Sequence, residues 1–116
     1  MKDIQGGKFM TYFEYINQQN INKGVEKFIN TENAMLLDVR TEEEFQEGHI
    51  AHSFNLPLHN ISKVSTIVHD KYTSIFVYCL SGARSEETVS ILESMGYVNV
   101  INIGGISSYK GKVVKE

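Results

Sequence analysis

Short apolar runs alternate along this chain with segments of helical periodicity, and this alternation most constrains its fold. The clearest unit begins with the apolar run "SIFVYC" (Ser74–Cys79), passes through a glycine-containing turn and enters "SEETVSILESMG". One helical stripe in that last segment consists of Thr88, Ile91, Leu92 and Met95, with Gly96 as a stop signal. A buried strand followed at once by a helix is typical of α/β proteins.

The remaining segments extend the same alternation. We expect further strands at Tyr12–Ile16, Met35–Val39, Ser53–Leu58 and Val98–Ile103. We expect a helix at Asn20–Ile29 with Asn20 as its N-cap, and another at Asn60–Asp70. Between them, we expect a short helix capped by Thr41, with Glu44 at its third position as in a capping box. The predicted fold is therefore α/β, with a central, mainly parallel sheet of about five strands flanked by helices.

Length and composition predict one ordinary domain. The chain has 116 residues, a formal net charge of −3 and one cysteine, Cys79. We expect a flexible lead-in at residues 1–10, the domain at residues 11–110 and a tail at residues 111–116. The negative charge disfavours nucleic acid, and no apolar run reaches the ~20 residues of a membrane span. A single thiol and the lack of an apolar leader favour a cytoplasmic location.

Cys79 lies where a predicted strand meets a predicted helix. Ligand sites in parallel sheets gather at the carboxyl ends of strands, and Cys79 occupies such an end. The helix start contributes partial positive charge, Arg84 adds a full one, and Gly82 permits a tight turn. These features predict a small anion cradle with a sulfur at its floor. A lone cysteine beside an apolar strand is also compatible with simple core packing.

The cradle is better suited to holding an anionic adduct than to ionising the thiol. A more acidic thiol is more fully ionised, but its nucleophilicity falls at the same time, so the two effects largely offset each other. Glu86 and Glu87 follow the loop and work slightly against a thiolate. Stabilising a bound anion or a charged transition state is therefore the more useful task for such a loop.

Four segments, in order, resemble the rhodanese family of sulfurtransferases. They are "LLDVRTEEEFQEGHI" (Leu36–Ile50), "NLPL" (Asn55–Leu58), "VYCLSGARS" (Val77–Ser85) and "MGYVNVINIGG" (Met95–Gly105). The similarity extends over about residues 11–110. It implies a rhodanese-like fold and an enzyme that moves sulfane sulfur from thiosulfate or a persulfide to a thiophilic acceptor.

The resemblance also implies roles for individual residues. Cys79 would become a persulfide, and the loop that holds it would consist of Leu80, Ser81, Gly82, Ala83 and Arg84. Supporting positions would be Asp38, Arg40, Glu44, His49 and Ser85. No metal or organic cofactor is implied. The partners would be a small sulfur-containing substrate or persulfide-carrying protein, and a thiol acceptor.

The supporting residues also have simple structural interpretations. Arg40 and Glu44 are spaced i,i+4 and are expected to form an ion pair. Asp38 interrupts an apolar strand, so its carboxylate needs partners. His49 and His52 are spaced i,i+3, but without a companion ligand pattern we do not expect a metal site.

The sequence departs from the family pattern at three positions, and other functions stay open. His52 and Ser53 replace the usual Gly and Ala, and Tyr109 replaces a common Trp. One alternative is a phosphatase or arsenate reductase of the same fold, although in those loops the arginine comes one residue later than Arg84. The others are a non-catalytic interaction module and a module of a larger protein.

Overall fold

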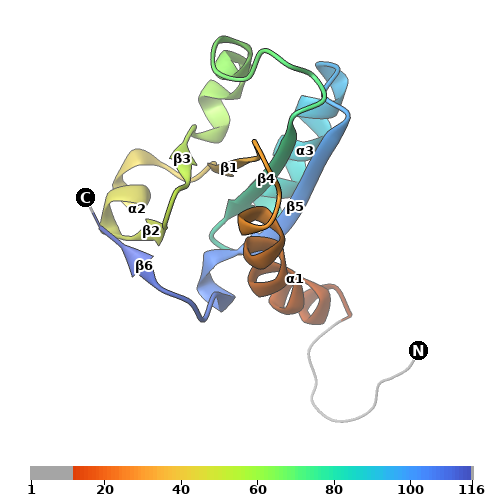
Figure 1. Ribbon diagram of the computed structural model, residues 1–116. Helices are drawn as coiled ribbons and strands as arrows, with labels where there is room; N and C mark the ends of the chain where they lie inside the picture. The colour runs from red at the N-terminus through yellow and green to blue at the C-terminus, as the bar shows by residue number, and fades with distance from the viewer. Residues whose placement is uncertain (1–11, 116) are drawn as a thin grey trace.

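The computed structural model describes residues 12–115, with side chains from residue 21 onward. Its elements follow the order α1 (Tyr12–Ile29), β1 (Met35–Asp38), α2 (Glu42–Glu47), β2 (His49–Ile50), β3 (Phe54–Asn55), η1 (Leu58–Thr66), β4 (Ser74–Cys79), α3 (Ala83–Ser94), β5 (Asn99–Gly105), η2 (Ile106–Ser108) and β6 (Val113–Val114). The two η elements are 3₁₀ helices. Figure 1 shows the helices arranged around the strands.

The central sheet has four parallel strands in the order β3-β1-β4-β5. Strands β2 and β6 form a separate antiparallel pair. The α/β class and the parallel central sheet are confirmed. The described sheet has one strand fewer than expected because Tyr12–Ile16 is helical.

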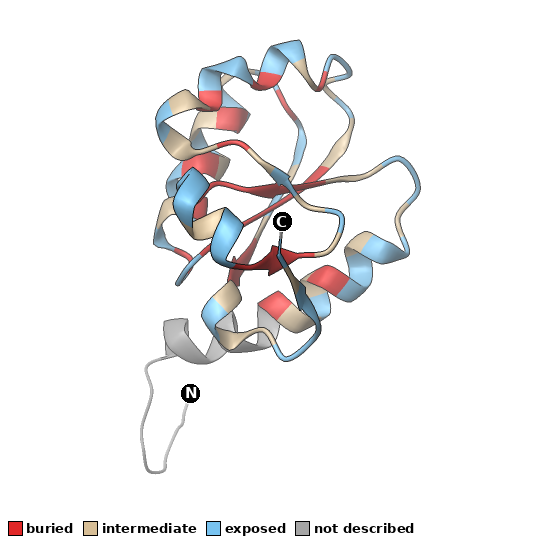
Figure 2. Cartoon of the chain, turned by 90° about the vertical axis from the view of Figure 1, so that its left-hand side faces the viewer, coloured by how far each residue is buried: buried red, intermediate tan, exposed pale blue. Residues whose placement is uncertain are grey.

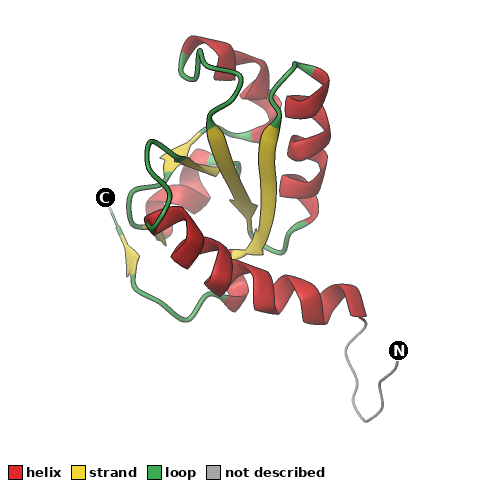
Figure 3. Ribbon diagram, turned by 45° about the vertical axis from the view of Figure 1, so that its right-hand side comes forward, coloured by secondary structure: helices red, strands yellow, loops and turns green. Residues whose placement is uncertain are grey.

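Alternation along β4 sends side chains to two different layers. Ile75, Val77 and Cys79 join the cluster packed against η1 and α3, whereas Phe76 and Tyr78 join the cluster packed against α1. Figure 3 shows α1 and α3 as separate helical layers flanking the strands, and Figure 2 shows buried strands beneath helices with exposed outer surfaces. The period of two along the strand therefore places the thiol on the α3 face.

The N-terminal helix is longer than predicted. The strand expected at Tyr12–Ile16 and the cap expected at Asn20 are both wrong, because α1 runs without a break from Tyr12 to Ile29. Aromatic and β-branched residues prefer strands by only ~1 kcal/mol, and extending an existing helix adds one hydrogen bond per residue. The lead-in predicted for residues 1–10 lies outside the described residues.

Two connecting segments are less regular than predicted. Only Phe54–Asn55 of Ser53–Leu58 is a strand, although the N–H groups of Leu56 and Leu58 still donate to Asp38 and Val39. The helix expected at Asn60–Asp70 is instead the 3₁₀ helix Leu58–Thr66, kinked at Asn60. Pro57, the residue before η1, has no N–H to donate to a neighbouring strand, so the regular strand ends before it.

The last described residues join the fold. Val113 and Val114, within the segment predicted to be a tail, pair antiparallel with Ile50 and His49. None of the helices in residues 12–115 combines the length and the apolar character needed to cross a membrane.

Candidate functional site

The loop after β4 carries Cys79 to the start of α3. Gly82 is the N-cap of α3 and has φ +110°, a left-handed conformation that favours glycine. From β5, Gly105 packs directly under the loop, and a Cβ there would collide with the carbonyl oxygen of Leu80. Two glycines thus permit a tight turn, and the side chain of Cys79 is 1% exposed beneath it.

The sulfur of Cys79 is surrounded by hydrogen-bond donors. The backbone N–H of Gly82 donates to Sγ at 3.0 Å and that of Ser85 at 3.4 Å, and the Ser85 hydroxyl lies 3.4 Å from Sγ. Among the described residues, none accepts a hydrogen bond from the backbone N–H groups of Ser81, Ala83 or Arg84. Ser81 lies in the loop, and Ala83 and Arg84 lie in the first turn of α3, where N–H groups without an acceptor are typical anion ligands.

Asn102 on β5 ties the loop to the sheet. Its Oδ1 accepts hydrogen bonds from the Ser85 hydroxyl at 2.7 Å and from the Gly104 N–H at 2.9 Å. Its Nδ2 donates to the Gly82 carbonyl at 3.2 Å and to Glu86 at 2.9 Å. Because the Gly104 N–H can only donate, it fixes the orientation of the amide.

The bond to Asn102 also orients the hydroxyl of Ser85. Asn102 Oδ1 is the nearest acceptor for its single proton, and the Gly82 carbonyl lies farther away at 3.0 Å. A lone pair of Ser85 therefore remains to accept the S–H of a neutral Cys79 thiol. Asn102 was missed by sequence reasoning, although a polar residue inside the apolar run "VNVINI" is a signal for it.

Arg84 forms an ion pair across the molecule. Its Nη1 and Nη2 donate to the two carboxylate oxygens of Glu44 at 2.8 and 3.0 Å. The pairing predicted between Arg40 and Glu44 is wrong, because Arg40 precedes α2 and does not lie on its helical face. The hydrogen bond from Arg84 lowers the pKa of Glu44 to about 2, and the bond to Glu44 in turn raises the pKa of Arg84.

Asp38 and Arg40 form a buried pair at the end of β1. Asp38 is 0% exposed and Arg40 5%. The guanidinium donates to the Asp38 carboxylate at 2.7 and 3.0 Å and to the carbonyl of Gly48 at 2.7 Å. Burial opposes the charge of Arg40, but the bonds to Asp38 raise its pKa overall. The expectation that Asp38 needs partners is confirmed, and the pair holds the end of α2 against the sheet.

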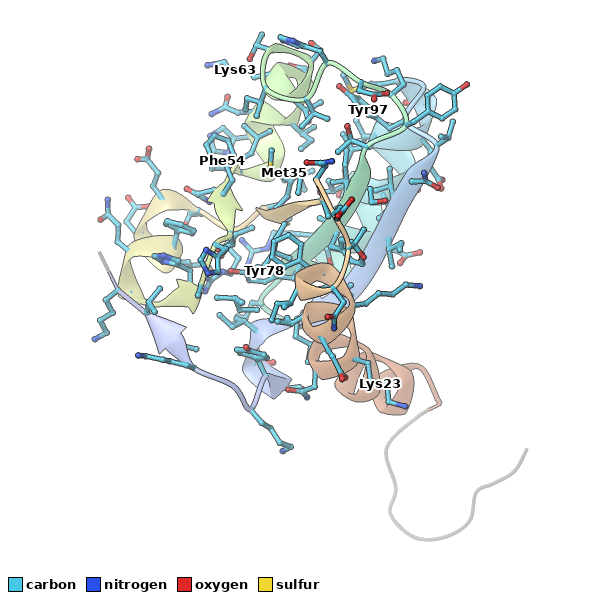
Figure 4. The ribbon with its side chains drawn as sticks, viewed as in Figure 1. Lys23, Met35, Phe54, Lys63, Tyr78 and Tyr97 are labelled. Carbon is cyan, nitrogen blue, oxygen red and sulfur yellow. The ribbon has the colours of Figure 1, made fainter. Side chains whose placement is uncertain are left out.

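Tyr78 and Ser53 support the turn that follows α2. The Tyr78 hydroxyl accepts from the Ile50 N–H at 3.0 Å and donates to the Ser53 hydroxyl at 3.1 Å. Figure 4 shows the Tyr78 ring between α1 and the segment that carries β2. Burial raises the pKa of Tyr78, so it stays a neutral donor. This contact gives a structural role to the serine that departs from the family pattern.

His49 packs beside α2. Its Nδ1 donates to the Phe45 carbonyl at 2.8 Å, and its ring stacks on that of Phe45 with centroids 3.7 Å apart. This tautomer follows because a carbonyl can only accept. Among the side chains that the structure describes, those of residues 21–115, no three His, Cys, Asp or Glu residues come together as a metal site would require.

The predicted residues fall into two connected groups. The first is the loop itself, where Gly82 and Ser85 contact the sulfur and Leu80 stands 44% exposed at the surface. The second group is built around α2 and consists of Asp38, Arg40, Glu44 and His49. The bond between Glu44 and Arg84 joins the two groups.

The chain is similar in sequence to known proteins. The family model described as Rhodanese-like domain matches residues 22–112. Thiosulfate sulfurtransferase PspE of Escherichia coli (strain K12) is 36% identical over 80 residues, which cover 68% of this chain and 77% of that protein. A protein named Sulfurtransferase from Allochromatium vinosum is 33% identical over 96 residues, covering 81% of this chain and 88% of that one.

A solved structure and a longer protein complete the comparison. The structure, rhodanese with anions from E. coli, has a TM-score of 0.67 and 34% identity and covers 72% of this chain and 99% of its own. A tRNA uridine(34) hydroxylase of Prochlorococcus marinus (strain MIT 9312) is 30% identical over 112 residues. This match covers 88% of the chain but only 35% of the hydroxylase.

Proposed function

The chain belongs to the rhodanese-like domain family, and from that premise we propose that Cys79 carries sulfane sulfur as a persulfide. Relatives named as sulfurtransferases support an enzyme of this general type. The observation that carries the proposal is the pair of backbone N–H groups, from Gly82 and Ser85, directed at the buried sulfur. Such donors stabilise negative charge on sulfur before and after transfer.

The first half-reaction loads the cysteine. The Cys79 thiolate attacks the outer sulfur of thiosulfate, so that a bond forms between Sγ and that sulfur. The S–S bond of thiosulfate breaks, and its electron pair leaves with sulfite. With a hydropersulfide donor, the same attack on the outer sulfur releases the donor's thiolate. Both routes leave one extra sulfur atom on Cys79, where the N–H groups of Ser81, Ala83 and Arg84 are available to bind it.

The second half-reaction removes the outer sulfur from the Cys79 persulfide. A thiophilic acceptor such as cyanide attacks the outer sulfur, and a new bond forms between the acceptor and that sulfur. The S–S bond of the persulfide breaks, and its electron pair returns to Cys79 as a thiolate. No redox partner or metal takes part, because the sulfur moves between nucleophiles.

Steady-state turnover tests this function. Wild-type protein should convert thiosulfate or a hydropersulfide, with cyanide, to thiocyanate, and Cys79→Ser and Cys79→Ala should not. Substantial thiocyanate production by both variants, once far-UV circular dichroism shows that they are folded, would exclude Cys79 as the sulfur carrier.

The main rival predicts a different substrate. Four residues separate Cys79 from Arg84, one fewer than the phosphatase pattern noted above, and the shorter loop suits a sulfur adduct better than a tetrahedral oxyanion. We therefore expect negligible hydrolysis of an aryl phosphate. Robust phosphatase activity without persulfide formation would favour the rival, and the absence of both activities would favour a non-catalytic module.

We further propose that a persulfide is a better donor than thiosulfate. Thiosulfate is a dianion, and Arg84 is the only cation in residues 79–87. Leu80, directly after the cysteine, is exposed and offers an apolar surface to the body of a larger persulfide or to a partner protein.

A further inference from the structure

The only cation of the cysteine loop is already bound to a carboxylate. Arg84 uses both terminal nitrogens on Glu44, which comes from a helix 40 residues earlier in the chain. The two side chains are 34% and 29% exposed, so the pair lies at the protein surface and within reach of an incoming anion. An anionic substrate therefore competes with Glu44 for this guanidinium.

Glu44 is itself held firmly in place. Its Oε1 also accepts hydrogen bonds from the Thr41 backbone N–H at 2.9 Å and from the Thr41 hydroxyl at 3.2 Å, as part of the capping box of α2. With a pKa of about 2, the carboxylate remains ionised at any working pH. Glu44 is therefore a negative charge held in place by Thr41, and it faces the guanidinium of Arg84 from the first turn of α3.

Arg84 directly precedes Ser85, whose backbone N–H donates to Cys79 Sγ at 3.4 Å, so this pairing lies beside the sulfur site. The hydrogen bond to Glu44 raises the pKa of Arg84, so its guanidinium stays charged. Glu86 and Glu87 on α3 bring further negative charge next to the loop. With Arg84 neutralised by Glu44, the loop residues offer a dianion backbone N–H groups but no uncompensated positive charge.

We propose that Glu44 is a specificity-determining residue that selects against dianionic sulfur donors by occupying Arg84. This inference rests on the proposed function. A donor of low charge has little to gain from a free guanidinium, whereas thiosulfate must compete with Glu44 for it. The ion pair thus favours persulfides over thiosulfate without touching the sulfur that is transferred.

Replacing the carboxylate by an amide isolates this effect. Glu44→Gln keeps the capping box, which accepts Glu or Gln, but removes the ion pair. Glu43→Gln is the matched control, because it makes the same change of net charge on the same helix at an exposed position. In Glu44→Gln, the exposed guanidinium of Arg84 no longer faces a carboxylate and can attract the thiosulfate dianion. The KM for thiosulfate should therefore fall about five-fold. The KM for 2-hydroxyethyl hydropersulfide, whose alkyl part is uncharged, should not change.

A double-mutant cycle shows whether the effect passes through Arg84. In an Arg84→Gln background, Glu44→Gln should no longer improve the KM for thiosulfate, because no guanidinium remains to be released. An equal change for both donors, or a loss of activity with both, would mean that Glu44 only maintains the loop and would overturn the inference. An unchanged KM for thiosulfate in Glu44→Gln would overturn it as well.

Binding of an unreactive dianion separates this inference from the proposed function. Sulfate should bind about five-fold more tightly to Glu44→Gln than to the wild type or Glu43→Gln, measured from the amide shifts of residues 80–85 in an NMR titration. Equal sulfate affinity in the three proteins would refute the role of Glu44. Wild-type protein that binds sulfate but forms no persulfide with either donor would refute the proposed function instead.

Discussion

At the scale of single residues, the surroundings of Cys79 depend on the side-chain amide of Asn102. This amide makes four hydrogen bonds, two accepted and two donated, to groups of the loop, the first turn of α3 and β5. It is linked to the sulfur through Ser85. Asn102 does not contact Sγ, so it acts as a positioning residue.

Asn102→Ala should destabilise the protein and slow the loading of Cys79. Removing the amide takes partners from the part-buried groups of Gly82 and Ser85, which should cost about 1–3 kcal/mol in the free energy of unfolding. Urea denaturation and the pH profile of persulfide formation measure the two effects. Asn99→Ala is the control, since the Asn99 side chain, on the same strand, donates to the exposed carbonyl of Tyr72. Equal behaviour of the two variants would leave Asn102 without a special role.

Leu80→Arg should improve the use of thiosulfate. An arginine at this exposed position adds a cation at the loop that Glu44 does not already hold. The KM for thiosulfate should fall about five-fold at low ionic strength, and added salt should erase much of the gain. Steady-state kinetics of the wild type and Leu80→Arg at two salt concentrations measure this change in KM. A wild-type KM already in the micromolar range, unaffected by the arginine, would contradict the charge argument.

At the scale of elements, α2 links the buried pair at the end of β1 to the cysteine loop. Arg40 binds the Gly48 carbonyl just after α2, and Glu44 within α2 binds Arg84 at the start of α3. The capping box of Thr41 and Glu44 was predicted correctly because it is a local pattern. The true partner of Glu44 was not, because local spacing carries no information about a residue 40 positions away.

Acid should weaken the ion pair between Glu44 and Arg84 at a predictable pH. Glu44 has its pKa lowered to about 2 from a usual value of 4.5, so the folded state favours its carboxylate. The resulting stability is present above the unfolded-state pKa and is lost as the pH falls through the folded-state pKa. The difference in free energy of unfolding between the wild type and Glu44→Gln should therefore be constant near pH 6 and shrink between about pH 4.5 and 2. A difference that stays constant across this range would show that the ion pair does not stabilise the fold.

Breaking the buried pair should cost more than breaking the surface pair. Asp38→Asn leaves the buried charge of Arg40 without its counter-ion, which should destabilise the fold by about 3–5 kcal/mol. Adding Arg40→Met removes the uncompensated charge and should recover part of the loss. Urea denaturation of the single and double variants measures both effects. A cost of well under 1 kcal/mol for Asp38→Asn would mean that water compensates Arg40.

At the scale of the whole molecule, the sheet with helices on both faces was predictable and its periphery was not. The parallel strands Met35–Asp38 and Ser74–Cys79 are nearly continuous apolar runs, and Gly96 ends α3 as expected. The aromatic start of α1 resembles a strand in composition, so its helical state was not visible locally. The pairing of β6 with β2 joins residues more than 60 positions apart, and no local pattern encodes it.

In the candidate site, too, the features that are local in sequence were predictable. Cys79 and its glycine turn were predictable because the strand, turn and helix are adjacent in sequence. Asn102 and Gly105 reach the loop from β5, so their contacts depend on the order of the strands. The residues within the loop were therefore predictable from the sequence, whereas Asn102, which bonds to the loop from a neighbouring strand, was not.

Intact mass spectrometry tests the central claim, that Cys79 carries the sulfur, most directly. Wild-type protein incubated with a hydropersulfide, and then freed of the donor, should gain the mass of one sulfur atom and lose it again on addition of cyanide. Cys79→Ser should gain nothing under the same conditions, since Cys79 is the only thiol in the chain. A wild-type protein whose mass never changes with either thiosulfate or the hydropersulfide, or a Cys79→Ser variant that takes up cyanide-labile sulfur, would contradict the account.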